Sequence, residues 1–254
     1  MIGRAVGWGF STARDAIARG LVRVKVTPNA LSALGIVITT AAGICYAIGS
    51  FWFIMLAGAL LIFSAACDML DGAVARLGNM TSRFGAFLDS TLDRYSDFAI
   101  YAGIAVYYAS REVPNVTFIL LSMLAFFNAF MISYTRARAE DIIEKCRVGY
   151  WQRGERFAAV LIGTFAFNIS ALVVQQAISP AFTWIRRMRH TKAIIDGKNP
   201  ITDPRKGGWW MKIRPWLWPR MTIPYDIITG LNILWLMFAP VPEIDPLRDW
   251  LAMV

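Results

Sequence analysis

Histidine and cysteine are scarce in this sequence of 254 residues, which contains one histidine and three cysteines. The single histidine, His190, excludes a metal site built mainly from imidazole ligands. Cys45, Cys67 and Cys146 lie far apart without metal-ligand spacing, so they predict small buried thiols and no disulfide framework. We also find no serine or cysteine arrangement that is typical of a nucleophilic catalyst.

Charged residues are few as well, at 17% of the chain against 57% hydrophobic residues. Soluble domains are about one quarter charged, and a membrane-spanning helix needs about 20 mainly apolar residues. Because a helix satisfies its own backbone in lipid, we predict an all-α integral membrane protein with six transmembrane helices, or seven. The candidate segments are residues 31–50, 51–67, 84–110, 116–134, 157–185 and 225–241.

Basic residues gather on one side of these segments, and the positive-inside rule makes that side cytoplasmic. The turn at Gly49 has no charge, whereas the opposite ends of the predicted spans carry Arg76, Arg83 and several later arginines. We therefore expect a multi-pass protein of the cell membrane whose acidic cluster faces the cytoplasm. Keeping Arg186 on the same side requires two short spans within 157–185, hinged near residues 168–170 and interrupted by a proline.

The two ends of the chain differ from the apolar middle. The first thirty residues are basic and lack the pattern of a signal peptide, so we favour an amphipathic helix on the membrane surface over a solvated leader. Residues 191–254 form a basic, Trp-rich segment and an apolar helix, and the net charge of +9 suits a membrane surface, with no nucleic acid expected as a partner. Headgroup contact and a plain basic loop explain its tryptophans equally well. They are Trp209, Trp210, Trp216 and Trp218.

Four aspartates, Asp68, Asp71, Asp89 and Asp93, lie close together beside the predicted spans. A charge at membrane depth costs about 2.5 to 3.5 kcal/mol, and neighbouring carboxylates repel, so a bound cation would offset both effects. Spacings of three and four residues place each pair on one helix face, and a short turn lets the two pairs meet. Oxygen ligands alone indicate Mg²⁺ or Mn²⁺. A single aspartate of this kind could instead cap a helix or pair with an arginine.

The residues around these aspartates resemble the CDP-alcohol phosphotransferase signature, D-x2-D-G-x2-A-R-x8-G-x3-D-x3-D, at every fixed position. The resemblance extends through about residue 190, so we expect a family membrane domain at 1–190. It implies a six-helix enzyme, usually a homodimer, that uses an alcohol to displace CMP from a CDP-linked lipid. The matching residues are Asp68, Asp71, Gly72, Ala75, Arg76, Gly85, Asp89 and Asp93.

The resemblance also implies a division of roles. Asp68, Asp71 and Asp89 would hold two divalent ions on the diphosphate, while Asp93 would accept the proton of the attacking hydroxyl and also touch metal. Metal neutralises the diphosphate and the departing CMP, and a general base is typically worth 10²–10⁴-fold. The implied CDP-binding residues are Asp68, Asp71, Gly72, Ala75, Arg76 and Gly85.

Four arginines, Arg136, Arg138, Arg153 and Arg156, lie at the predicted cytoplasmic ends of two neighbouring helices. Guanidinium groups suit a phosphorylated acceptor, although positive-inside anchoring explains them equally well. The amino-acid sequences of residues 88–97, 133–140 and 153–156 resemble those of the phosphatidylinositol-phosphate and archaetidylinositol-phosphate synthase branch. That branch implies inositol 1-phosphate as the acceptor and CDP-diacylglycerol or CDP-archaeol as the donor. The long C-terminal segment and the compressed fifth and sixth spans depart from the family pattern.

Other functions remain open at this point. Glycerol 3-phosphate is the alternative acceptor because it also needs a basic pocket, whereas serine or an uncharged alcohol fits less well. A cation transporter would need carboxylates spread across the membrane depth, and arginines beside the pathway would repel its cargo. A catalytically inactive scaffold is disfavoured because all four aspartates are present.

Overall fold

The computed structural model describes residues 2–198, 200, 204–214, 217, 218, 220 and 222–253; Trp216 lies outside this set. Within it the chain is helical and contains no strand, which confirms the predicted all-α class. The helices are α1 (Ile2–Arg23), α2 (Pro28–Ile48), α3 (Phe51–Leu77), α4 (Arg83–Ala109), α5 (Val116–Glu140), α6 (Arg153–Phe165), α7 (Ile169–Ile178), α8 (Ala181–Ile195), η1 (Pro204–Lys206), α9 (Trp209–Lys212), α10 (Ile223–Phe238) and α11 (Pro246–Leu251).

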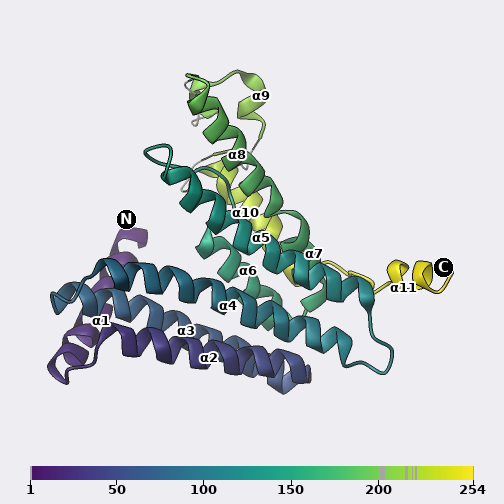
Figure 1. Cartoon of the computed structure of the whole chain (residues 1–254), viewed down its shortest axis with the longest axis horizontal. Helices are drawn as coiled ribbons and strands as arrows, with labels where there is room; N and C mark the ends of the chain where they lie inside the picture. The colour runs from purple at the N-terminus through teal and green to yellow at the C-terminus, as the bar shows by residue number, and fades with distance from the viewer. Residues whose placement is uncertain are drawn as a thin grey trace.

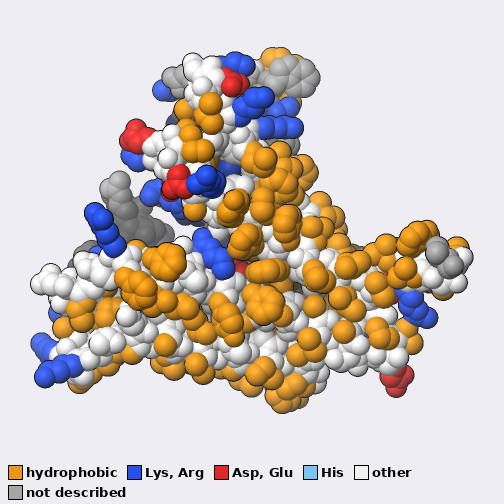
Figure 2. Space-filling model, in the orientation of Figure 1, with side chains coloured by type: hydrophobic (Ala, Val, Ile, Leu, Met, Phe, Trp, Pro, Cys, Tyr) orange, Lys and Arg blue, Asp and Glu red, His pale blue; other side chains and the backbone are white. Residues whose placement is uncertain are grey.

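Three of these helices, α2, α3 and α5, are long and apolar enough to cross a membrane, and α10 is a shorter apolar helix. Helix α4 has the same length as α3, 27 residues, but it carries the charged residues Arg83, Asp89, Asp93, Arg94 and Asp97. Figure 2 shows hydrophobic side chains spread over the outer face of α4 and its neighbours, with Lys and Arg gathered toward α8 and α9. Apolar surface of this extent is typical of contact with lipid.

Helix α2 begins where the sequence predicts. The Thr27 hydroxyl accepts a hydrogen bond from the Ala30 N–H, and Pro28 occupies the first turn, where a missing N–H costs nothing. The helix ends at Gly49, whose φ of 73° is a left-handed conformation that glycine adopts without strain. The chain then turns directly into α3.

The packing of α2 arranges the first half of the molecule. It contacts both α3 and α4, and Figure 1 shows these three helices crossing a second group formed by α5 to α8 and α10. At the α2–α4 contact a methyl group on Gly103 would lie 2.1 Å from the Gly43 carbonyl oxygen, so only glycine allows this approach. Helix α2 thus sits between α3 and α4 and leaves room between their polar ends.

The segment expected to form two short spans folds into three helices. The first break lies at residues 166–168, where Phe167 has a φ of 52° and the Asn168 side chain caps α7 at the Ala171 N–H. A second break falls at Pro180, because proline cannot continue the hydrogen bonding of a helix. Helix α5 packs along both α7 and α8, so these two short helices together match its length.

The C-terminal segment returns to the α4–α5 turn after α10 packs against α6. The Glu243 carboxylate accepts hydrogen bonds from Arg111 and from the Ser170 hydroxyl at 2.6 Å. The Asp245 carboxylate accepts from the backbone N–H groups of Val116 and Thr117, at 2.7 and 2.9 Å, which satisfies the free N-terminus of α5.

Both carboxyl groups titrate below their usual range. Burial alone would raise the pKa of Glu243, but the hydrogen bonds from Arg111 and Ser170 outweigh burial and lower it. The same balance lowers the pKa of Asp245, where Thr117 and Val116 are the donors. A carboxyl whose pKa is lower in the folded state stabilises the fold above its unfolded pKa of about 4, and this stabilisation is lost as the pH falls through the folded value.

We expect the Asp245→Ala substitution to lower the melting temperature in detergent, by the equivalent of about 0.5 to 2 kcal/mol, because the N–H groups of Val116 and Thr117 in the first turn of α5 lose their acceptor. The difference from the unsubstituted protein should persist at neutral pH and close in acid below about pH 4. Intrinsic tryptophan fluorescence during heating measures both. Asp249→Ala is the control, since Asp249 is exposed on α11. Equal melting temperatures for Asp245→Ala and the control would contradict the anchoring role.

Candidate active site

The four aspartates lie on two helices, with Asp68 and Asp71 on α3 and Asp89 and Asp93 on α4. One carboxylate oxygen from each of Asp68, Asp71 and Asp89 lies within 4.8 Å of the others. Oxygen ligands this close repel one another strongly and suit a hard divalent cation. A cavity of about 30 Å³ lies between these residues. The ligand set therefore fits Mg²⁺ or Mn²⁺.

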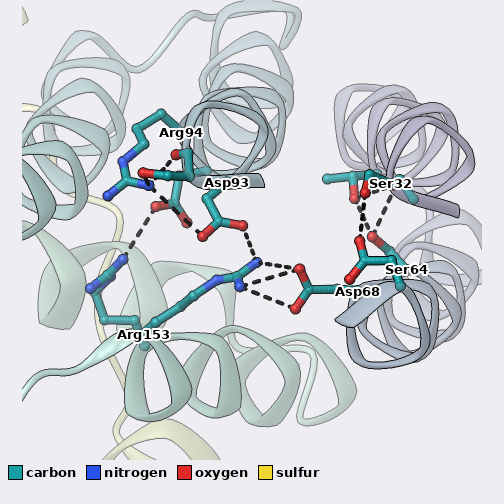
Figure 3. A network of polar contacts seen from close by, with 12 residues as sticks. Ser32, Ser64, Asp68, Asp93, Arg94 and Arg153 are labelled. Atoms are coloured by element: carbon teal, nitrogen blue, oxygen red, sulfur yellow. Dashed lines mark hydrogen bonds and ion pairs between the residues drawn. The ribbon is translucent and has the colours of Figure 1, made fainter. Parts of the chain in front are cut away.

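Asp93 lies apart from this group of three and faces Arg153 instead. The Arg153 Nη2 atom is 2.5 Å from Asp93 Oδ1, and its Nη1 atom is 3.1 Å from Asp68 Oδ2. Figure 3 shows the guanidinium of Arg153 between the two carboxylates, with Arg94 on the far side of Asp93. Arg153 therefore links α6 to both α3 and α4 through charge.

Asp71 is held from the opposite side, by α2. It is 6% exposed, and the Ser32 hydroxyl donates a hydrogen bond of 2.6 Å to its Oδ2 atom. Next to it the Ser64 hydroxyl donates to the Gly35 carbonyl oxygen at 3.0 Å. Buried polar groups need partners of this kind, so α2 fixes the direction of the Asp71 carboxylate.

The sequence-predicted CDP-binding residues gather around the α3–α4 turn. Gly72 leaves open space beside Asp71, since an added methyl group would meet only the Arg76 guanidinium, at 3.3 Å. Ala75 is partly exposed and Arg76 is exposed, one turn further along α3. The Gly85 N–H donates to the Ser82 hydroxyl at 2.9 Å at the start of α4. All four residues thus lie at the same ends of α3 and α4 as the aspartates.

The structure separates the four predicted acceptor arginines. Arg136, Arg153 and Arg156 line one cavity of about 270 Å³ that also contains Asp93. Arg156 is buried and donates to Asp97 at 3.2 Å. Arg138 lies outside this cavity lining, and its exposed side chain pairs with Asp141 at 3.2 Å.

Sequence reasoning missed a buried arginine that supports this cavity. Arg187 of α8 is 1% exposed and donates to the Val148 carbonyl oxygen at 3.1 Å and to Gln152 Oε1 at 3.0 Å. It also donates to the Ile132 carbonyl oxygen. Arg187 thereby holds the loop that leads directly into Arg153. In the sequence it is one of a run of basic residues, and nothing there distinguishes it from its exposed neighbour Arg189.

Residues 25–188 match the CDP-alcohol phosphatidyltransferase family. The chain belongs to this family. It is 38% identical to the archaetidylinositol phosphate synthase of Methanothermobacter thermautotrophicus, over 65% of this chain and 83% of that protein. It is 35% identical to the archaetidylinositol phosphate synthase of Pyrococcus horikoshii, over 72% of this chain and 92% of that protein.

Solved structures of a phosphatidylinositol phosphate synthase from Mycobacterium tuberculosis share the fold. The structure with CDP-DAG bound has a TM-score of 0.64 at 29% identity and covers 70% of this chain and 92% of that chain. The complex with manganese and citrate has a TM-score of 0.64 at 28% identity, over 70% and 88% of the two chains. This CDP-alcohol phosphatidyltransferase is therefore a transferase of lipid metabolism, and the transporter alternative loses its support.

We expect Asp71→Asn or Asp89→Asn to weaken Mn²⁺ binding about tenfold or more, because each removes a charged oxygen from the group of three. The loss of the free Mn²⁺ signal in electron paramagnetic resonance gives the affinity. Asp141→Asn is the matched control, since Asp141 is exposed and lies outside the group. Unchanged Mn²⁺ affinity in both cluster variants would contradict a metal site at this place.

Proposed function

We propose that the protein transfers the phosphatidyl-type group of a CDP-linked lipid to inositol 1-phosphate and releases CMP. The observation that carries this proposal is the position of Arg153, which pairs with Asp68 and Asp93 and also lines the arginine-rich cavity beside them. The names of the archaeal and mycobacterial relatives support an inositol phosphate as the acceptor. Diacylglycerol and archaeol both remain compatible as the lipid part of the donor.

The chemistry divides between two groups of carboxylates. Asp68, Asp71 and Asp89 would hold divalent metal, Mg²⁺ or Mn²⁺ in two ions, which would supply neutralisation of the diphosphate and of the leaving CMP. Asp93 accepts the proton of the acceptor hydroxyl as that oxygen bonds to the lipid-bearing phosphorus, and the bond from this phosphorus to CMP breaks. Asp93 lines the same small cavity as these three carboxylates, and Arg153 pairs with both Asp93 and Asp68.

Substrate binding uses the remaining motif residues and the arginines. Gly72, Ala75, Arg76 and Gly85, together with Asp68 and Asp71, line the CDP site, and their place around one turn supports this role. The acceptor phosphate binds Arg136, Arg153 and Arg156, which share a cavity with Asp93. Guanidinium groups bind phosphate through two parallel hydrogen bonds, so they orient it as well as hold it. The exposed pairing of Arg138 with Asp141 favours a surface role for Arg138 instead.

We propose six spans in the cell membrane, with the active site facing the cytoplasm and α1 lying on the membrane surface. The distribution of arginines at the ends of α3, α4, α5 and α6 supports this orientation. Helix α6 then forms the fifth span and α7 with α8 the sixth, while α10 is the candidate for a seventh. A homodimer follows from the family resemblance, and light scattering of the purified protein tests it.

The acceptor is tested by mass spectrometry of the lipid formed from CDP-lipid, Mg²⁺ and a panel of alcohols. We expect a product carrying inositol phosphate, because the cavity beside Asp93 offers guanidinium groups to a phosphate. Free inositol and serine serve as matched acceptors without a phosphate. Product from glycerol 3-phosphate alone would overturn the choice of acceptor, and absence of CMP release with every alcohol would overturn the transfer itself.

A further inference from the structure

A second, larger cavity adjoins the active site and is closed by the C-terminal segment. It measures about 910 Å³. One wall consists of α5, the α5–α6 loop and α8, and the other of Leu217, Trp218, Tyr225 and two arginines that follow the family match, which ends at residue 188. Arg205, Leu217, Trp218, Arg220 and Tyr225 therefore add a wall that the family region does not supply.

Arginine dominates the lining of this cavity, and no carboxylate is among the lining residues that the structure describes. Four of the arginines belong to the family region and two to the C-terminal segment. Arg153 lines this cavity and the small acidic cavity alike, so the basic volume opens directly beside Asp93. A volume with this charge suits an anion such as a phosphomonoester. The lining arginines are Arg136, Arg147, Arg153, Arg186, Arg205 and Arg220.

Arg220 is attached to the helix that carries Arg153. Its Nε and Nη2 atoms donate to the two carboxylate oxygens of Glu155, each at 2.7 Å. The Tyr225 hydroxyl donates to the same carboxylate at 2.6 Å, and the Tyr225 ring lies 5.3 Å from that of Tyr150. The two parallel hydrogen bonds from Arg220 to Glu155 fix the planar guanidinium in one orientation. A guanidinium carries five N–H groups, so one edge can hold Glu155 while another meets a phosphate.

We propose that Arg220, held by Glu155 and Tyr225, determines acceptor specificity by binding the phosphate of a phosphorylated polyol as it enters the active site. The proposal rests on the proposed function. Glu155, which holds Arg220, lies two residues after Arg153 in the first turn of α6. The same helical turn therefore connects Arg220 to Arg153, which pairs with Asp68 and Asp93. The C-terminal segment acts here on the acceptor and not on the CDP-lipid.

The test compares the Michaelis constants for inositol 1-phosphate and for CDP-lipid in three variants. Arg220→Ala should raise KM for inositol 1-phosphate about tenfold or more, the usual effect of losing a charged hydrogen bond, and leave KM for CDP-lipid unchanged. Tyr225→Phe should give a smaller rise, because it loosens Arg220 without removing it. Arg220→Lys should recover part of the affinity, since the charge remains. Arg214→Ala is the control, because Arg214 is exposed on the same segment and does not line the cavity.

An equal rise in both Michaelis constants, or an unchanged KM for inositol 1-phosphate, would overturn the proposal in favour of a purely structural latch. Size-exclusion profiles and melting temperatures identify misfolded variants. If Arg220→Ala does not fold, Tyr225→Phe and Arg220→Lys decide the question by the same two constants. If the unsubstituted enzyme makes no lipid from inositol 1-phosphate, the proposed function fails separately. Calorimetry with inorganic phosphate then tests the cavity: weaker binding to Arg220→Ala than to Arg214→Ala supports the site, and equal binding overturns it.

Discussion

The contact of Arg153 with Asp68 and Asp93 is the interaction on which the rest of the site depends. Carboxylates that are this close at the end of a membrane helix bundle repel one another, and each needs a positive partner or a metal. Arg153 supplies one positive charge to two of them, on two different helices. Its position therefore sets how α6 sits against α3 and α4.

Several layers of structure keep Arg153 in this place. The buried guanidinium of Arg187 fixes the backbone of the loop before α6 at Val148 and the side chain of Gln152. On the other side of the helix, Arg220 and Tyr225 hold Glu155. Contacts on both sides thus hold the start of α6 in place, because a long side chain alone keeps too much rotational freedom to hold a fixed geometry.

The site also shows why one enzyme needs opposite charges side by side. A CDP-lipid and a phosphorylated alcohol are both anions, and they must come within reacting distance of each other. In the proposed function, carboxylates with their metal on one face and guanidinium groups on the other would receive the two anions separately and bring them together. Asp93 lies at the boundary, next to the metal group on one side and the arginine-lined cavity on the other.

The sequence allowed the bounds of α4, the start of α5 and the end of α2 to be predicted closely, because long apolar runs end at turn residues such as Gly49. Helix α5 continues six residues beyond the predicted end at 134, because its last turns are charged and the prediction followed the apolar run. The meeting of Asp68, Asp71 and Asp89 also followed, since spacing along a helix determines its faces. The pairing of Arg153 with Asp68 could not be predicted, because 85 residues separate them and no local pattern encodes the contact. For the same reason the roles of Ser32 and Arg187 were invisible. The breaks that divide residues 153–195 into three helices lie near Asn168 and at Pro180, where the sequence indicates a hinge and an interruption. The packing of α7 and α8 along α5 could not be predicted, because periodicity does not report which helices meet.

The most direct measurement of this division of roles is CMP release by the Asp93→Asn variant, with Mn²⁺ binding measured on the same sample. We predict that Mn²⁺ affinity stays close to that of the unsubstituted protein, because Asp68, Asp71 and Asp89 remain. CMP release should fall by about 10²–10⁴-fold, the usual contribution of a general base. Full CMP release with metal still bound would contradict the assignment of Asp93 as the base.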